Sequence, residues 1–111
     1  MNKLIYHIAS KTDWEVCTDL ACYKPSKFDS CGFIHCSTKE QIENIANTIY
    51  QGREDVLMLI IESSLVKSEI KYEDVVAKYP HIYGFLNKDA IIRVVRIYSE
   101  HDCCFRLKDY E

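Results

Sequence analysis

The sequence lacks the features that mark disordered, membrane-spanning or secreted chains. Its 111 residues include only 3 Gly and 2 Pro, which argues against a disordered or linker-rich chain. No segment approaches ~18 uninterrupted apolar residues, so no transmembrane helix is expected. The opening Met-Asn-Lys-Leu-Ile-Tyr-His holds no apolar run of signal-peptide length. These absences predict a cytoplasmic protein that does not engage a membrane.

Positive charge is also sparse and scattered. The formal net charge is −3, and the 14 Lys and Arg residues form no basic stripe. A dedicated nucleic-acid-binding protein usually gathers its cations on one face. The sequence therefore predicts no dedicated nucleic-acid surface, while a nucleotide ligand held by a few residues stays open.

The six cysteines lack the spacing of a metal site. No pair is separated as Cys-x-x-Cys, and no histidine lies at zinc-finger spacing from such a pair. A disulfide framework needs an oxidising compartment, which nothing in the sequence indicates. We therefore expect no bound metal and mostly buried free thiols, at Cys17, Cys22, Cys31, Cys36, Cys103 and Cys104.

What the chain does contain is apolar residues, which make up 48% of it. A chain of this length and composition builds one hydrophobic core, and we expect a single domain over residues 1–111. Strand-like and helix-like segments alternate early, while the second half lacks crossover helices. The fold class expected is therefore α+β, a single small domain with two main helices and a mixed or mostly antiparallel sheet. A doubly wound parallel sheet is the alternative.

The stretch 32–41, Gly-Phe-Ile-His-Cys-Ser-Thr-Lys-Glu-Gln, joins the end of a strand to the start of a helix. Alternation separates two pairs of side chains, Ile34 with Cys36 on one side and Phe33 with His35 on the other. Ser37 is expected to cap the helix, with Glu40 three residues on completing a capping box. Junctions of this kind expose side chains and backbone N–H groups together, which suits an anionic ligand.

Apolar periodicity predicts the other elements. Residues 4–9 should form a strand, and the continuous apolar run 56–61 is typical of a strand buried on both faces. A stripe at helical spacing predicts a helix over 38–51, ended by Gly52. A helix is also expected over 13–21, capped by Ser10 or Thr12, with Trp14, Cys17 and Leu20 facing the core. The remaining expectations are a loop over 23–30, a turn over 63–66, strands over 70–73 and 90–98, a loop opened by Pro80, and a short strand over 105–107.

Histidines are the main candidates for chemistry. His7 and His35 lie at strand ends, and His81 follows Pro80 in a segment with Tyr83. A lone strand histidine is usually a structural residue, but several near one another suit ligand binding and proton transfer. A three-histidine metal site is the alternative, and His101, in a polar tail, is expected at the surface.

Nucleophilic catalysis is less well supported. Cys36 should point away from His35, and Ser37 is explained as a helix cap. The chain has neither a Gly-x-Ser-x-Gly elbow nor a glycine-rich phosphate loop. Glu62 and Glu73 are candidate general bases or ribose-binding acids.

Several blocks of the sequence resemble one family. They are residues 5–8, Trp14, Tyr23, 32–38 with Gln41, 72–73, 80–86 and 90–94, which together look like the domain of unknown function numbered 952, DUF952. That family resembles the ADP-ribosyltransferase-like fold group, small split-sheet α+β domains whose cleft binds NAD or an ADP-ribose moiety. RNA 2′-phosphotransferases and the catalytic domain of poly-ADP-ribose polymerases are its nearest analogues.

The resemblance implies roles for individual residues. His7 would contact the nicotinamide-side ribose, His35 would stand where an aromatic ring stacks on nicotinamide, and Glu73 is the candidate for the late acidic residue. Tyr23, Ser37, Thr38, His81 and Tyr83 would complete a ligand-binding cleft. NAD is the implied substrate or ligand, and a small nucleotide-like molecule the implied partner.

Three functions follow. The first is an ADP-ribosyltransferase-like domain that binds, and transfers or processes, an ADP-ribose unit. The second is an inactive binding module that keeps the cleft. The third is an interaction protein, since the 8 tyrosines suit a protein interface.

Overall fold

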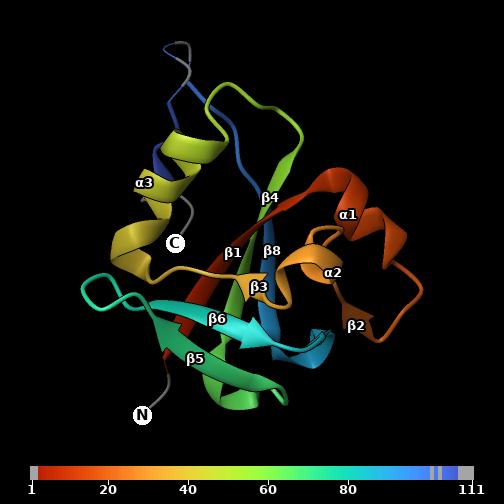
Figure 1. The fold of residues 1–111 in the computed structure, drawn as a ribbon. Helices are drawn as coiled ribbons and strands as arrows, with labels where there is room; N and C mark the ends of the chain where they lie inside the picture. The colour runs from red at the N-terminus through yellow and green to blue at the C-terminus, as the bar shows by residue number, and fades with distance from the viewer. Residues whose placement is uncertain (1–2, 101, 103, 108–111) are drawn as a thin grey trace.

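The computed structural model describes residues 3–100, 102 and 104–107. Its strands are β1 (Leu4–Ser10), β2 (Cys22–Tyr23), β3 (Ile34–His35), β4 (Val56–Glu62), β5 (Glu69–Glu73), β6 (Tyr79–Tyr83), β7 (Leu86–Asn87) and β8 (Ile91–Arg96). Its helices are α1 (Lys11–Val16), α2 (Phe28–Cys31) and α3 (Lys39–Ile49), with short 3-10 turns η1 (Ser63–Leu65) and η2 (Lys88–Ala90) (Figure 1).

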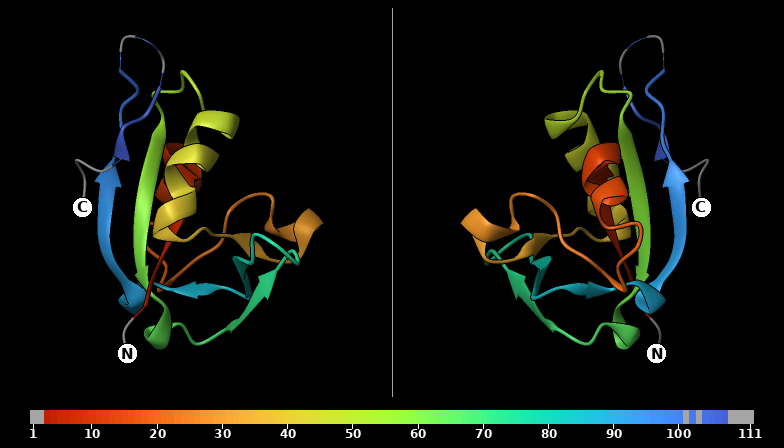
Figure 2. Two further views of the ribbon diagram at one scale, coloured as in Figure 1. Left: turned by 90° about the vertical axis from the view of Figure 1, so that its left-hand side faces the viewer. Right: turned by 90° about the vertical axis from the view of Figure 1, so that its right-hand side faces the viewer.

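The strands form three small sheets, in the orders β1-β4-β8, β2-β7 and β3-β6-β5. Every pairing among the described strands is antiparallel. The fold is thus a small α+β arrangement of mostly antiparallel sheets with few helices, as predicted, and the parallel alternative is wrong. In Figure 2, α1, α3 and the β3-β6-β5 sheet all lie to the same side of β4.

Strand β4 is the centre of the core. All seven of its residues are buried, as the run of apolar residues predicted. Leu59 and Ile61 pack in a cluster with Ile5 and Tyr23, whereas Met58 belongs to a second cluster that includes α3 residues. Burial of such a side chain stabilises the fold by about 1.5–3 kcal/mol. Packing on both faces of β4 fixes β1 beside it, and the other edge of β1 faces the segment that follows β3.

The junction after β3 differs from the prediction by one residue. Thr38, not Ser37, is the N-cap of α3, and its backbone N–H donates to Oε1 of Gln41 at 2.9 Å. Ser37 pairs through its backbone with Tyr6 instead, with N···O distances of 2.8 and 2.7 Å. The bridge keeps Ser37 extended, so the helix cannot begin there. The segment between β3 and α3 is thereby tied to β1.

The predicted loop at Pro80 is wrong, because this residue lies within strand β6. Its carbonyl accepts from the Cys36 N–H at 3.1 Å. Pro80 follows the β3–β6 pairs Ile34 with Ile82 and His35 with His81, and on the other side of β6 it is paired with Tyr72 of β5. Pro80 therefore joins the sheet through its carbonyl and supplies no N–H of its own.

Several other expectations also need correction. Helix α1 spans Lys11–Val16 rather than 13–21, and Leu20 is exposed rather than in the core, although Ser10 caps the helix as one alternative predicted. Helix α3 ends at Ile49 with Tyr50 as its C-cap, and Gly52 follows at φ 78°. The expected loop 23–30 includes the start of α2, and the expected strand over 105–107 reduces to a bridge between Ser99 and Phe105.

The described cysteines Cys17, Cys22, Cys31, Cys36 and Cys104 are free thiols. Cys17 and Cys36 are buried and Cys22 and Cys104 are half-buried, whereas Cys31 is exposed, which corrects the expectation for that residue. The predictions for His101 and Cys103 lie outside the described residues. Among the described helices, none has both the length and the apolarity needed to cross a membrane.

Candidate functional site

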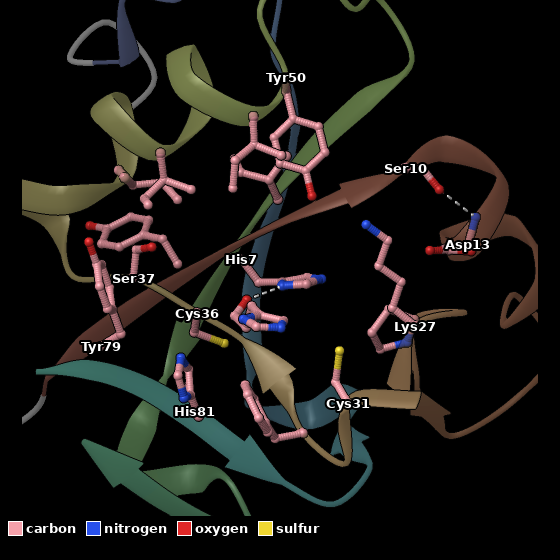
Figure 3. Close-up of a pocket in the computed structure, with 18 of the residues that line it drawn as sticks. His7, Ser10, Asp13, Lys27, Cys31, Cys36, Ser37, Tyr50, Tyr79 and His81 are labelled. Carbon is pink, nitrogen blue, oxygen red and sulfur yellow. Dashed lines mark hydrogen bonds between the residues drawn. The ribbon is translucent and has the colours of Figure 1, made fainter. Parts of the chain in front are cut away.

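A cavity of about 730 Å³ lies beside β1. Its lining comes from β1, α1, the segment 25–31, β3, α3 and β6. In Figure 3, Tyr50, which follows α3, lies above the cavity, Cys36 and the strand carrying His81 lie below it, and Lys27 and Asp13 lie on the side away from Tyr79. Segments distant in the sequence therefore meet around one space.

His7 is buried at the back of this cavity, and both of its ring nitrogens have partners. Nδ1 lies 2.5 Å from the backbone carbonyl of His35, and Nε2 lies 2.9 Å from the Tyr23 hydroxyl. Because a carbonyl can only accept, Nδ1 carries the proton, and Tyr23 donates to Nε2. Burial lowers the pKa of His7 to about 4.

His7 is therefore a neutral imidazole in one tautomer, already engaged at both nitrogens. It has no free lone pair for a metal ion, which argues against the three-histidine metal site. In the described part of the chain, no group of three His, Cys, Asp or Glu side chains is arranged to hold a metal ion. The position of His7 ties β1 to β3 and to the buried ring of Tyr23.

One wall of the cavity is built from aromatic and imidazole rings. Phe33 stacks on His81 with ring centroids 4.3 Å apart and planes at 21°, and it contacts the ring of His35 at 4.6 Å. His35 and His81 face each other across the β3–β6 ladder, with centroids 5.3 Å apart. Tyr79 lies parallel to His81 at 6.4 Å. These odd-numbered residues share one face of the sheet, while Ile34 and Ile82 on the other face are buried.

The two cavity histidines of this wall differ from His7 in their access to solvent. The His35 side chain is exposed, and its pKa is lowered by partial burial, then by His81 and by Lys27. His81 is half-buried, with Nδ1 2.9 Å from Oε1 of Glu73. Since Nδ1–H donates to that carboxylate, Nε2 is the nitrogen of His81 left for a ligand.

Glu73 does not line the cavity. Its Oε1 atom accepts from the Tyr83 hydroxyl at 2.5 Å as well as from His81. These bonds, from Tyr83 first and His81 second, lower the pKa of Glu73. The carboxylate therefore orients an imidazole of the wall rather than facing the cavity.

The opposite end of the cavity is polar. Asp13 accepts from the Ser26 hydroxyl at 3.3 Å, and Ser10 caps the helix on which Asp13 lies. Arg53 also lines this end but is paired with Asp55 at 2.5 Å. The cavity thus offers rings at one end and a carboxylate, hydroxyls and cations at the other.

The structure brings five of the predicted site residues to the cavity wall and leaves three outside it. His7, Tyr23, His35, Ser37 and His81 line the cavity, whereas Thr38, Glu73 and Tyr83 do not. Cys36 also lines it, but burial raises the pKa of its thiol, so it stays protonated and weakly nucleophilic.

The lining also includes residues that the sequence did not mark as site candidates, among them Asp13, Lys27, Phe33 and Tyr79. Alternation along β3 and β6 puts Phe33 and Tyr79 on the faces of His35 and His81, so that signal was available. Asp13 and Lys27 lie on a short helix and a loop whose placement no periodicity predicts.

The sequence matches the family model described as "Protein of unknown function (DUF952)" over residues 8–94. The match covers most of the chain, and the protein belongs to this family. None of the curated proteins compared with the chain gives a significant match.

Solved structures with the same fold come from Caulobacter crescentus. The crystal structure of protein CC0527 is 24% identical, covers 96% of each chain and superposes with a TM-score of 0.86. The solution NMR structure of CC0527 is 25% identical, covers 97% of this chain and 96% of that one, and has a TM-score of 0.83. These likenesses establish the fold.

Proposed function

We propose that this protein binds NAD, ADP-ribose or a related nucleotide in the cavity beside β1. The observation that carries the proposal is the wall of four rings formed by Phe33, His35, Tyr79 and His81 on one side of that space. Planar rings offer stacking surfaces for a base, with about 1–3 kcal/mol for each stacked base in known nucleic-acid sites. The volume of about 730 Å³ falls in the range of ordinary ligand sites.

The roles of the histidines follow from their surroundings. His35 and His81 present accessible imidazoles that contact the ligand, and Glu73 orients His81 from behind. His7 is fixed by two hydrogen bonds, so its contribution is a rigid, neutral back wall joined to the Tyr23 hydroxyl. Ser37 supplies a hydroxyl beside the same wall.

The relation to ADP-ribosyltransferase-like proteins is part of this proposal. It is supported by the position of His7 on β1 beside His35 on β3, where the side chain of the first reaches the backbone of the second at 2.5 Å. These are the positions that the sequence resemblance assigns to the first two motifs.

Calorimetric titration with NAD, ADP-ribose and a 2′-phosphorylated nucleotide tests the proposal. We expect the wild type to bind at least one of them, and His35→Ala and His81→Ala each to weaken that binding about tenfold or more. Tyr72→Ala is the control, because this exposed ring lies on the opposite face of the same sheet. Absence of binding, or equal binding by all variants, removes the proposal.

Binding without transfer is the second candidate, and the place of Glu73 favours it. A transferase needs an acid beside the ribose, whereas Glu73 is engaged with His81 and Tyr83 outside the cavity lining. The two candidates are separated by incubating NAD with excess protein and measuring free nicotinamide over hours. Release above the His35→Ala background supports transfer or hydrolysis, and binding without release supports a binding module.

A further inference from the structure

Lys27 is a cation on the cavity wall with no acidic partner among the described residues. Its side chain extends into the cavity from the side opposite Tyr79 and His81 (Figure 3). Other cations nearby are engaged, Lys24 with Asp29 at 3.2 Å and Arg53 with Asp55 at 2.5 Å. Lys27 forms no comparable ion pair in the described structure.

The backbone of Lys27 is held firmly although its ammonium group is unpaired. Its carbonyl accepts from the N–H groups of Ser30 and Cys31 at 3.1 and 3.0 Å, and from the Ser30 hydroxyl at 3.0 Å. Helix α2 then ends at Gly32, whose left-handed φ of 85° suits glycine. The base of the side chain is therefore fixed at the edge of the cavity.

The charge of Lys27 acts on the ring wall. Together with burial and with His81, it lowers the pKa of His35. A negative group placed between the lysine and the imidazoles would be attracted to Lys27 and would favour protonation of His35. The carboxylate on the same side, Asp13, bonds to Ser26 rather than to Lys27, so it does not occupy this position.

We infer that Lys27 is the anion-recognition residue of the cavity and that the ligand it selects is a phosphorylated nucleoside rather than the free nucleoside. The inference rests on the proposed function, because it assumes that the base of the ligand lies on the ring wall. A lysine ammonium is a compact charge that pairs with phosphate without demanding a fixed geometry. The chain as a whole carries a net charge of −3, so an anion must be attracted locally rather than by the molecular surface.

The test compares nucleosides with their 5′-phosphates by calorimetry, using adenosine with AMP and nicotinamide riboside with its mononucleotide. The wild type should bind the phosphorylated member of a pair at least about tenfold more tightly. Lys27→Met should lower the affinity for the phosphorylated member to about that for its nucleoside, so that the difference disappears. Lys24→Met is the matched control. Lys24 lies three residues before Lys27 and does not line the cavity, so this variant loses the same charge outside the site.

The outcomes separate the two proposals. If Lys27→Met keeps the phosphate preference, or if Lys24→Met reduces it equally, Lys27 is not the selecting residue and the nucleotide site still stands. If the wild type binds neither member of either pair, the inference about Lys27 falls, and the titrations with NAD, ADP-ribose and the 2′-phosphorylated nucleotide decide the proposed function separately. Because Lys27 is exposed, its variant should keep the thermal midpoint of the wild type, which circular dichroism checks.

Discussion

Glu73 and His81 form a hydrogen-bonded pair at 2.9 Å, and the same carboxylate oxygen accepts the Tyr83 hydroxyl at 2.5 Å. The pair lies across neighbouring strands β5 and β6, whose register sets Glu73 opposite Tyr79. One carboxylate thus links two rings of the sheet that forms the cavity wall. Its effect on a ligand is transmitted through His81.

The titration of Glu73 should depend on Tyr83. The hydroxyl of Tyr83 is the first cause of the lowered pKa of Glu73, and His81 is the second. Tyr83→Phe should therefore raise this pKa toward the ordinary value of about 4.3. The stabilisation from the pair is present above that value and is lost as the pH falls through the lowered pKa. Carbon-13 NMR titration of the carboxyl group measures the shift, with Tyr72→Phe as the control.

Removal of the Tyr23 hydroxyl should destabilise the fold. Tyr23 is fully buried, and its hydroxyl is the partner of Nε2 of His7 at 2.9 Å. Tyr23→Phe leaves that nitrogen buried without a donor, which costs about 1–3 kcal/mol. Urea denaturation of Tyr23→Phe should show this loss, whereas Tyr72→Phe at an exposed ring should change the free energy of unfolding by less than about 0.5 kcal/mol. Equal stability of the two variants would contradict the assigned bond.

Mild acid should weaken the fold through His7. The folded pKa of about 4 lies below the ordinary value of 6.5, so the unfolded chain binds a proton first as the pH falls. Stability from this group is present above about pH 6.5 and is lost as the pH falls toward about 4. From about pH 7 to about pH 5 the loss should approach about 2 kcal/mol.

The comparison that isolates this contribution is His7→Gln, which has no imidazole to titrate. Its unfolding free energy should fall by about 2 kcal/mol less than that of the wild type over the same interval. Urea denaturation of both proteins at the two pH values gives the change in unfolding free energy of each protein over this interval. An equal change in unfolding free energy for the two proteins would show that His7 is not the buried neutral group described here.

The start of α3 can be tested with two neighbouring substitutions. Thr38 is the N-cap, and its side chain accepts the backbone N–H of Gln41 in the capping box, a bond that alanine cannot make, so Thr38→Ala should cost about 1 kcal/mol. Ser37 pairs with Tyr6 through the backbone, which alanine retains, so Ser37→Ala should cost less. Thermal denaturation of both variants distinguishes the two registers. A larger loss of stability in Ser37→Ala than in Thr38→Ala would show that Ser37 is the cap, as the sequence pattern predicted.

The sequence predicted those parts of the fold that depend on local pattern. The apolar run in β4 and the stripe that includes Ile42 and Ala46 in α3 are both buried as expected. Two errors arose where a tertiary contact decided between local options. Pro80 lies in a strand because it pairs with Tyr72 of β5 and accepts the Cys36 N–H, and Ser37 is not the cap because its pairing with Tyr6 holds it extended.

In the candidate site, too, local pattern predicted some residues correctly, and tertiary contacts decided the others. The strand alternation around His35 correctly separates the wall from the core, because a pleat leaves only two faces. Glu73 was expected to face the ligand, but the register of β5 on β6 puts it within reach of His81 and Tyr83. Asp13 and Lys27 lie at the end of the cavity that depends on how α1 and the loop before α2 fold over β1, which side-chain pattern does not encode.

The ladder between β3 and β6 joins the wall with two residue pairs, Ile34 with Ile82 and His35 with His81. So short a ladder opens at a lower free energy than the long pairing of β1 with β4. A compound bound to rings of both strands would hold β3 and β6 together and reduce the opening of this ladder. Slowed hydrogen–deuterium exchange of the backbone amides in β3 and β6 would then report occupancy, so the strand pair could serve as an internal reporter when screening compound libraries of unrelated chemistry.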